Sequence, residues 1–490
     1  MKYLLGIDFG GGASKATLLC ENGEIVATST TEYETIYPNP GWVEQNPDDW
    51  VRACCENISS VLKKSKVSAN EICAVSLDAA THTAVIMDEN FNVIRNSIYW
   101  TDTRSTEEVK FLRENYGEII EKQVLHSADT IWTLPELMWI KNNEPENWSK
   151  TKKILFSKDY VRHKLTGDYV TDYIEAEGSM MFDINTMNWS SELCGVLGIT
   201  LEMMPKIVKP TDIAGKITKD ASLLTGLTEG TPVLCGTTDT VMEVFASGAV
   251  EKGDMTLKLA TAGRICVITD KPYPDKALIN YSHIADGLFY PGTGTKSCAA
   301  SMRWFRDTFG GDYAEFEEIC KDIPIGSDGL VFHPYLNGEL TPYANPKLCG
   351  DFTGIRAFHT KAHFANSVME GVAMSMLDCK NTLESLNVAH NDCAALIGGG
   401  GKSKIWRQMI ADALGIKLVE MKYADSSFGS AMLAGVAVGV FESFKKALEI
   451  CNEKVSETIP NMENNKKYQK LFAKYKYIQK ALEPVYNGEY

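Results

Sequence analysis

Two aspartates, Asp8 and Asp239, stand where a buried strand gives way to small residues, a place suited to polar chemistry. Asp8 lies in GIDFGGGASK, whose glycines would let a ligand approach the backbone closely. Asp239 lies in TPVLCGTTDTVMEVFASG, residues 231–248, which has the pattern of a strand, a small-residue loop and a helix. Asp8 could hold a metal ion through water, and Asp239 could act as a general base, because ligand sites of α/β proteins gather at the carboxyl ends of strands. Taken alone, however, Asp8 fits a turn-stabilising role better, and Asp239 fits equally well as the N-cap of the following helix.

A third stretch rich in small residues, ALIGGGGKSKIW at residues 395–406, predicts a strand, four glycines and a helix. It is not a Walker P-loop, because Leu396 stands where that motif needs glycine. Four glycines cost backbone entropy on folding, so contact with a flat or anionic ligand is favoured over a merely structural turn. His359 and His363 have the i, i+4 spacing of a zinc pair, but no HExxH glutamate and no evident third ligand accompany them. We therefore expect a structural role for these histidines.

The glycines after Asp8 lead into a second strand rather than a helix. KATLLC, the turn pair Asn22-Gly23 and EIVATSTTEY read as two more strands of a meander. Walker and dinucleotide loops run from a strand into a helix, so this loop must offer its amides at the tip of a β-hairpin. The second half repeats the theme, with MTLKLA, a turn at residues 261–263 and RICVITD.

Helical patterns follow each hairpin. Asn46-Pro47-Asp48-Asp49 predicts a helix start, and Ser105 with Glu108 suggests a capping box ahead of a helix that Gly117 would close. Amphipathic helices are expected at about 360–388, 403–414, 426–443 and 465–483. At 490 residues the chain exceeds what one core usually supports. We expect an α/β protein of two similar lobes, residues 1–246 and 247–490.

Composition argues against some classes of partner and of cellular location. Lys and Arg number 49 against 64 acidic residues, a net charge of −15, which disfavours nucleic acid and anionic membranes as main partners. The thirteen cysteines include no CxxC pair, which fits reduced thiols in a cytoplasmic protein. The longest apolar run, residues 431–441, is far shorter than the roughly 20 residues of a spanning helix. No signal-peptide pattern precedes Asp8.

In this order, the segments resemble the FGGY family of carbohydrate kinases, within the actin and sugar-kinase ATPase superfamily. The likeness spans almost the whole chain, and GDFTGIRAFHTKAHFANSVME at residues 350–370 matches the family's C-terminal signature. GIDFGGGASK resembles the first phosphate loop, GTTD the catalytic-Asp segment, ATAG the second phosphate loop and GGGGKS the adenosine loop. Within the family the likeness to xylulokinases is the nearest, through THT at 81–83, YWTDTR at 99–104 and YLNGELTPYANP at 335–346.

Some residues depart from the family pattern. His82 is kept, and Gly11 and Gly12 replace a hydroxyl pair in the first loop, which leaves its amides but not its side-chain contacts. The other departures are Thr81 for Met, Thr83 for Gly, Glu136 for Lys, Thr240 for Asn and Leu340 for Arg.

The resemblance implies two actin-like (ribonuclease H-like) ATPase lobes with a central cleft, the first binding sugar and the second nucleotide. It implies ATP-dependent phosphorylation of a sugar hydroxyl, most simply of a ketopentose such as xylulose. Asp239 would be the general base, and Asp8 and Asp239 would hold Mg²⁺. The implied substrate-binding residues are Thr81, His82, Asp102, Arg104, Trp132 and Asp239. The implied nucleotide-binding residues are Gly10, Gly11, Gly12, Ser14, Lys15, Thr261, Gly263, Gly398, Gly399, Gly400 and Gly401.

Alternatives remain open. The altered pocket residues are compatible with a sister kinase that acts on another ketose, a sugar acid or a polyol. The altered first loop is compatible with a non-catalytic nucleotide sensor or scaffold, since fold alone does not fix function. The expected partners are a sugar and ATP, without nucleic acid or membrane, and a homodimer is considered.

Overall fold

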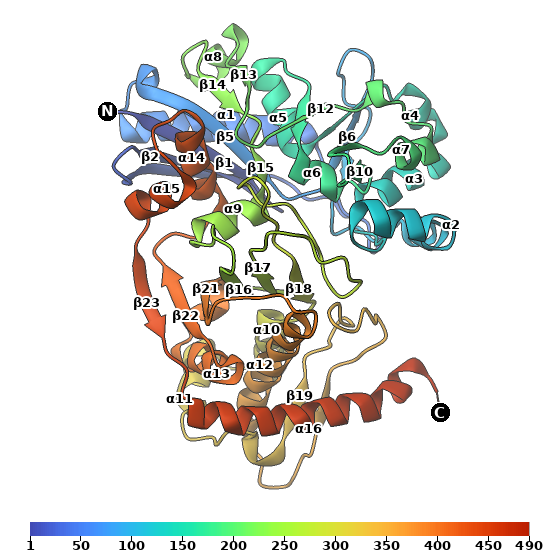
Figure 1. Cartoon of the computed structure of the whole chain (residues 1–490), viewed down its shortest axis with the longest axis vertical. Helices are drawn as coiled ribbons and strands as arrows, with labels where there is room; N and C mark the ends of the chain where they lie inside the picture. Colours follow the sequence, from blue (N-terminus) through green and yellow to red (C-terminus); the bar gives the residue numbers. More distant parts are fainter. Residues whose placement is uncertain (490) are drawn as a thin grey trace. The chain divides into compact units, whose positions relative to one another are not determined.

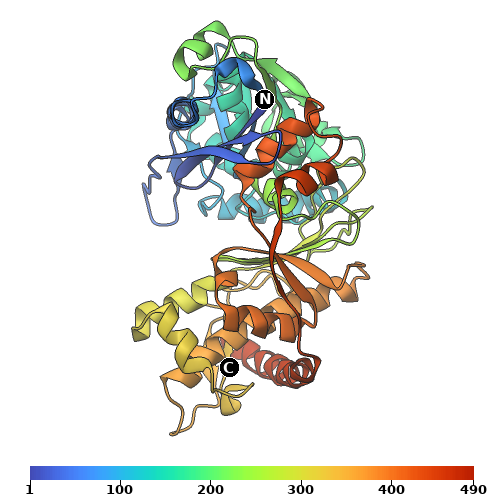
Figure 2. The same cartoon turned by 90° about the vertical axis from the view of Figure 1, so that its left-hand side faces the viewer.

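The computed structural model describes residues 1–489 and divides the chain into two compact units, each built from three segments. Unit 1 comprises residues 1–248, 281–287 and 423–453. Unit 2 comprises residues 249–280 and 288–422 and runs from residue 454 to the end of the described chain. The single boundary expected at residue 246 therefore falls close to the first crossing between units, but the chain later returns twice to unit 1. Figure 2 shows residues 423–453, in orange-red, among the blue and green elements of unit 1.

The sheet of unit 1 has the strand order β13-β14-β5-β1-β2-β3, with β15 paired to β5 (Figure 1). β1, β2 and β3 form an antiparallel meander, and β5 runs parallel to β1. β14 is parallel to β5, and β13 closes the edge in the antiparallel sense. The strands are β1 (Tyr3–Phe9), β2 (Ala13–Cys20), β3 (Ile25–Glu32), β5 (Ile72–Ala79), β13 (Ile213–Lys216), β14 (Pro232–Leu234) and β15 (Thr237–Thr238).

The sheet of unit 2 repeats this arrangement in the order β18-β17-β16-β21-β22-β23. Again an antiparallel meander is followed by two parallel strands and an antiparallel edge strand. The strands are β16 (Met255–Leu259), β17 (Gly263–Val267), β18 (Gly292–Thr295), β21 (Cys393–Ile397), β22 (Lys417–Met421) and β23 (Lys454–Thr458). The expectation of two similar α/β lobes, each opening with a glycine-turned hairpin, is confirmed.

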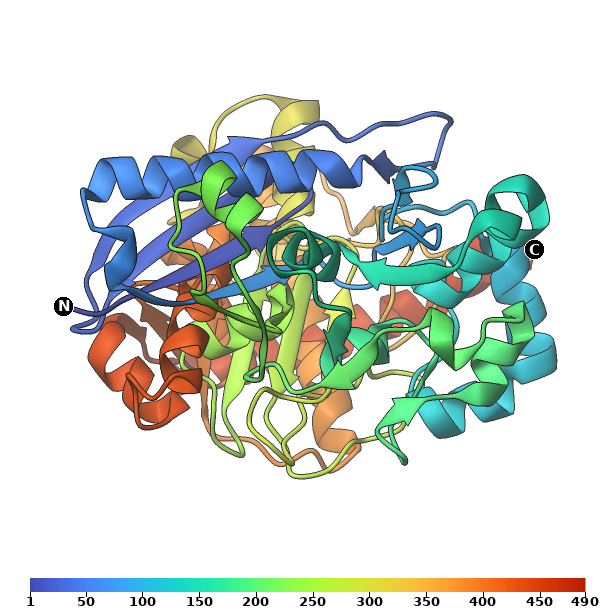
Figure 3. The ribbon, with the colours of Figure 1, turned by 90° about the horizontal axis from the view of Figure 1, so that it is seen from above.

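Two helices of unit 1 pack on the strands that carry the aspartates. α1 (Pro47–Ser65) begins where the Asn46 side chain accepts the Asp48 N–H, as expected, and packs against β2 and β3 (Figure 3). α14 (Ser426–Ala437) packs against β1, β2 and β5. Its backbone comes so close that a Cβ atom at Gly6 would lie 2.0 Å from the carbonyl oxygen of Ser427. Only glycine permits this approach of α14 to β1.

The remaining elements of unit 1 surround this sheet. They are β4 (Glu44–Gln45), β6 (Ala84–Met87), β7 (Ser97–Ile98), α2 (Thr106–Val124), α3 (Thr133–Asn143), α4 (Pro145–Lys150), β8 (Lys153–Phe156), α5 (Ser157–Thr166), β9 (Val170–Asp172), α6 (Tyr173–Gly178), β10 (Phe182–Asp183), β11 (Asn188–Trp189), α7 (Ser191–Leu197), β12 (Lys206–Val208), α8 (Lys219–Thr225), α9 (Asp239–Ala246) and α15 (Phe444–Cys451).

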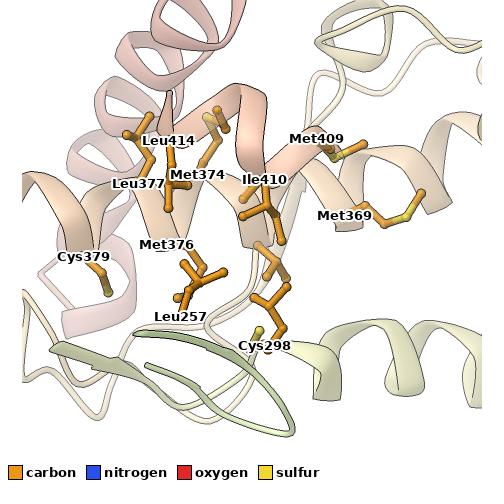
Figure 4. Packing of buried hydrophobic residues seen from close by; sticks show 14 of the residues in the cluster. Leu257, Cys298, Met369, Met374, Met376, Leu377, Cys379, Met409, Ile410 and Leu414 are labelled. Carbon is orange, nitrogen blue, oxygen red and sulfur yellow. The ribbon is translucent and has the colours of Figure 1, made fainter. Parts of the chain in front are cut away.

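Helices α12 and α13 build the core of unit 2 against β16 (Figure 4). Met376 and Leu377 of α12 are buried, as are Leu257 of β16 and Ile410 of α13. Full burial of one such side chain stabilises the fold by about 1.5–3 kcal/mol, so this core fixes α13 and the glycines that precede it. The further elements of unit 2 are α10 (Ala299–Phe309), α11 (Tyr313–Cys320), β19 (Val331–His333), β20 (Asp351–Thr353), α12 (Lys361–Ser385), α13 (Lys404–Leu414) and α16 (Met462–Asn487).

Two helix boundaries differ from expectation. The capping box is wrong: Ser105 precedes α2 with ψ 27° and makes no side-chain cap, while Glu108 accepts a hydrogen bond from Asn142. Gly117 does not close α2, which continues to Val124, because no steric or backbone feature interrupts the helix there. The stretch expected as one helix at 426–443 ends at Ala437.

Two absences expected from composition hold for the part of the chain that the structure describes. All thirteen cysteines are free thiols. None of the helices within residues 1–489 combines the length and apolar character needed to cross a membrane.

Candidate active site

Three aspartates meet at one edge of the unit 1 sheet, where β1, β5 and β15 end. Asp8 and Asp78 occupy paired positions of the parallel strands β1 and β5, and Thr237 of β15 pairs with Asp78 on its other side. Asp239 follows as the first residue of α9, and its carboxylate accepts a hydrogen bond from Thr240 (3.1 Å). The N-cap position belongs to Thr238, so the N-cap interpretation of Asp239 is wrong.

The carboxyl groups of Asp8 and Asp78 interact, and the pKa of each is raised. Burial and the charge of Asp239 together raise the pKa of Asp8 to about 7, against the lowering effect of hydrogen bonds with Asp78 and Ser426. Burial, and then the charge of Asp8, raise the pKa of Asp78 well above its usual range. Two carboxyl groups can hydrogen-bond only when one keeps a proton. Oδ2 of Asp78 accepts the Ser430 hydroxyl (2.5 Å), and Oδ1 meets no N–H or hydroxyl donor within residues 1–489, so we assign the proton to Asp78 Oδ1.

The first glycine loop turns its carbonyl groups inward. The Tyr33 hydroxyl donates to Gly10 O (2.5 Å), and the side chains of Thr35 and Gln45 donate to Gly11 O (2.6 and 2.8 Å). The N–H groups of Gly11 and Gly12 make no hydrogen bond with any described residue. The tip of the hairpin therefore offers two backbone N–H groups to an anion.

The neighbouring Ser14 and Lys15 are engaged elsewhere. Ser14 is fully buried in β2, and Lys15 forms an ion pair with Asp425 (3.1 Å), whose carboxylate caps α14. These two side chains therefore stabilise the base of the loop, and the loop offers ligands its backbone.

His82 is clamped in an unusual backbone conformation. Its φ of 70° lies in the left-handed region, which costs a non-glycine residue roughly 1–3 kcal/mol and recurs at functional sites. Its N–H donates to Glu175 (2.8 Å), and its carbonyl accepts the Thr133 hydroxyl (2.5 Å), so the conformation is held from both sides. Thr81, the preceding residue, is partly exposed.

The imidazole of His82 has a defined hydrogen-bonding role. Nδ1 lies 3.0 Å from the Gly178 carbonyl, which only accepts, so we assign the ring proton to Nδ1 and leave Nε2 as an acceptor. Nε2 lies 3.3 Å from the Tyr281 hydroxyl, and the Trp132 ring meets the imidazole edge-on at 4.6 Å. Burial, with a smaller contribution from His126, lowers the pKa of His82 to about 3, so the ring is neutral.

Asp102 and Arg104 form a buried ion pair. The guanidinium of Arg104 donates to both oxygens of Asp102 and to Glu44 (2.8 Å), and it packs over the Trp42 ring at 4.0 Å. The side chains of both residues are 1% exposed. The polar atoms of Asp102 and Arg104 are therefore used within the protein. His82 and Trp132, two others of the predicted substrate-binding residues, contact each other instead.

The small-residue loops of unit 2 also meet at one sheet edge. Residues 260–262 follow β16 and residues 398–402 follow β21, two parallel strands paired at Lys258 and Ile397. Gly398 has a φ of 95°, and a Cβ atom there would lie 2.6 Å from Leu259 O. Glycine is thus required for the close contact of the two loops.

The available amides in these loops differ from those expected. Within residues 1–489 the N–H groups of Thr261 and Ala262 make no hydrogen bond, and both residues are exposed. Gly263 is buried and donates its N–H to Thr295 (3.1 Å). Among the four glycines, Gly401 is buried against Leu396, while Gly399 is exposed. Thr261, Ala262 and Gly399 are therefore better placed than Gly263 and Gly401 to touch a ligand.

The histidine pair has the structural role expected. His363 Nδ1 lies 3.0 Å from the Thr360 hydroxyl and accepts the Thr360 N–H (3.2 Å), which forms a capping box at the start of α12. His359 Nδ1 accepts the Arg356 N–H (3.1 Å).

Comparison with known proteins places this geometry in a family. Residues 3–246 match the model of the FGGY family of carbohydrate kinases, N-terminal domain, and residues 264–438 match its C-terminal domain. The chain belongs to the FGGY family of carbohydrate kinases. It is a phosphotransferase with the two-domain, actin-like ATPase fold of that family.

Three similar proteins illustrate the relationship. A xylulose kinase of Bacillus subtilis strain 168 is 32% identical over 98% of this chain and 97% of its own length. A gluconokinase of Bacillus licheniformis is 28% identical over 99% of this chain and 97% of its own. The structure of a ligand-bound xylulose kinase from Lactobacillus acidophilus matches with a TM-score of 0.94 at 26% identity, over 100% of both chains.

FGGY kinases use ATP and typically a divalent metal. No group of three or more His, Cys, Asp or Glu side chains within residues 1–489 is arranged to cage a metal ion. Mg²⁺ is usually held by one or two carboxylates, with waters and substrate phosphates completing its shell. The oxygen-only donors Asp8 and Asp239 fit that mode of binding.

Two neighbours of this edge are not among the site residues predicted from sequence. Asp78 ends the buried strand ICAVSLDA as Asp8 ends β1, so the same signal was available, but no glycine follows it. Tyr99 is the first residue of the segment YWTDTR, but its place beside the first loop arises only through tertiary folding.

Proposed function

We propose that this FGGY kinase transfers the terminal phosphate of Mg-ATP to a hydroxyl of a ketopentose such as xylulose, with Asp239 as the general base. The observation that carries the proposal is the position of Asp239 at the sheet edge beside Asp8, partly exposed, in a chain whose relatives include xylulose kinases.

Asp239 accepts the proton of the attacking sugar hydroxyl. A positioned base is typically worth about 10²–10⁴ in rate. The free N–H groups of Gly11 and Gly12 would bind phosphate oxygens. Asp8 and Asp239 would hold Mg²⁺. Mg²⁺, when bound, neutralises charge on the phosphates.

His82 would bind the sugar. Nε2 accepts a sugar hydroxyl in place of, or together with, that of Tyr281. The residues that contact His82 are Thr133, Glu175, Gly178, Trp132 and Tyr281, and none of these is cationic. A neutral ketose therefore suits these surroundings better than a sugar acid, whose carboxylate would lack a counter-ion there.

The second candidate substrate is gluconate. It is favoured by the relative named gluconokinase, whose 28% identity equals or exceeds that of xylulose kinases at 27–28%. ADP release coupled to a panel of ketopentoses, ketohexoses, polyols and gluconate decides between them, with product analysis by NMR to locate the phosphate. Turnover of gluconate alone would exclude the ketopentose, and no turnover above background on any compound would favour the sensor or scaffold.

A further inference from the structure

The hydroxyl of Tyr99 lies against the first glycine loop. Tyr99 directly follows β7, its N–H donates to the Val43 carbonyl (2.9 Å), and its ring is buried beside Val43 and Ala80. A Cβ atom built on Gly11 would lie 3.2 Å from the Tyr99 hydroxyl oxygen. Tyr99 is 7% exposed, so the ring is fixed while its hydroxyl faces the loop.

This hydroxyl retains its proton as a donor. Burial, followed by the charges of Asp239 and Asp8, raises the pKa of Tyr99, so the group stays neutral at physiological pH. No acceptor for the proton of Tyr99 itself is found among residues 1–489. A hydroxyl that donates no hydrogen bond within the described protein is available to donate one to a ligand.

The Tyr99 hydroxyl limits the space available to a side chain at residue 11. The φ of Gly11 lies outside the left-handed region, so its backbone conformation does not require glycine. The Tyr99 hydroxyl restricts a side chain there, because a contact of 3.2 Å is tighter than ordinary packing and the hydroxyl would have to shift. The neighbouring Gly12 has nothing within 4 Å of its Cβ position. The space where a side chain of residue 11 would begin is therefore bordered by a hydroxyl from another part of the chain.

We propose that the Tyr99 hydroxyl donates a hydrogen bond to an oxygen of the nucleotide's terminal phosphate, beside the free N–H groups of Gly11 and Gly12. The inference rests on the proposed function in taking ATP as the ligand. It adds a side-chain donor to a loop that otherwise supplies only backbone N–H groups. Hydrogen bonds to charged groups are stronger than neutral ones, so the contact holds the phosphate that is transferred.

The test uses the full chain and two nucleotides that differ in the terminal phosphate. Tyr99→Phe is compared with the wild type by calorimetric titration with Mg-AMP-PNP and with Mg-ADP. The AMP-PNP affinity is expected to fall about tenfold or more, while the ADP affinity changes less than about twofold. An unchanged ratio of the two affinities overturns the inference, as does an effect confined to the KM of the sugar.

Two further variants separate this role from a structural one. Tyr33→Phe removes a hydroxyl that donates to carbonyls of the same loop, so it is expected to lower the melting temperature and leave the affinity ratio at the wild-type value. Gly11→Ser in the Tyr99→Phe background returns a hydroxyl to the vacated space and is expected to recover AMP-PNP affinity. A wild type that binds both nucleotides but phosphorylates no sugar would refute the proposed function and leave this inference standing.

Discussion

Asp8 and Asp78 face each other across paired positions of β1 and β5, and their carboxyl groups are hydrogen-bonded. The proton assigned to Asp78 lets the Asp8 carboxylate stand at the sheet edge without the repulsion of a second neighbouring charge. The Ser430 hydroxyl completes the arrangement from α14. The sheet edge thus presents Asp8 in an ordered orientation, backed by a neutral acid.

Replacement of Asp78 tests this assignment. Asp78→Asn is expected to be nearly as stable as the wild type, because its N–H₂ can donate to Asp8 while its oxygen accepts Ser430. Asp78→Ala leaves both partners buried without their hydrogen bonds and is expected to cost about 1–3 kcal/mol. The measurement is thermal unfolding of the two variants side by side. Equal losses in both would show that Asp78 is ionised.

Asp239→Asn tests the general base. The variant keeps the size of the side chain and its place at the start of α9, so folding and ADP binding are expected to be unchanged. The kcat is expected to fall by about 10²–10⁴, the usual contribution of a positioned base. Coupled ADP release with the best sugar of the panel provides the measurement. A kcat near that of the wild type would remove Asp239 from this role.

Gly178→Ala tests the position of His82. A Cβ atom at residue 178 would lie 2.5 Å from His82 Nδ1 and would displace the imidazole. The KM for the sugar is expected to rise about tenfold, and stability to fall by about 1–3 kcal/mol from overpacking. Gly195→Ala is the matched control, because nothing lies within 4 Å of its Cβ position in α7. An unchanged KM for Gly178→Ala would mean that His82 does not touch the sugar.

Glu370 gives unit 2 a pH-dependent stability. Burial raises its pKa to about 7, against hydrogen bonds from Gly326, Ser327 and Asn366. The folded chain therefore keeps this proton up to about pH 7, whereas the unfolded chain loses it near pH 4.5. The contribution of Glu370 to the free energy of unfolding is complete below the pKa of the unfolded chain. It is lost as pH rises through the folded pKa, by about 3 kcal/mol in all.

Glu370→Gln removes that titration while keeping the shape of the side chain. The melting temperature of the variant, relative to the wild type, is expected to rise steadily between pH 5 and about pH 8. A difference between the two proteins that stays constant over this range would contradict the assignment.

Features written in local sequence were predicted well. Glycines between two apolar strands gave the hairpin after Asp8, and the long periodic stretch that contains Met376 gave α12. Tertiary relationships were missed. Asp78 becomes part of the site only when β5 pairs with β1, and the left-handed conformation of His82 depends on clamps from Glu175 and Thr133, far away in the chain. Ser105 shows that a cap pattern forms only if the backbone before the helix is extended.

The return of α14 to unit 1 limits how the molecule can be dissected. A fragment that stops at residue 246 would contain every strand of the first sheet but would lack α14. The apolar surface of β1, β2 and β5 that α14 covers would then be exposed to solvent. Such a fragment should aggregate when expressed alone. Joining residues 423–453 to it through a short flexible linker should restore solubility, which makes the lobes separable by design although the gene order interleaves them.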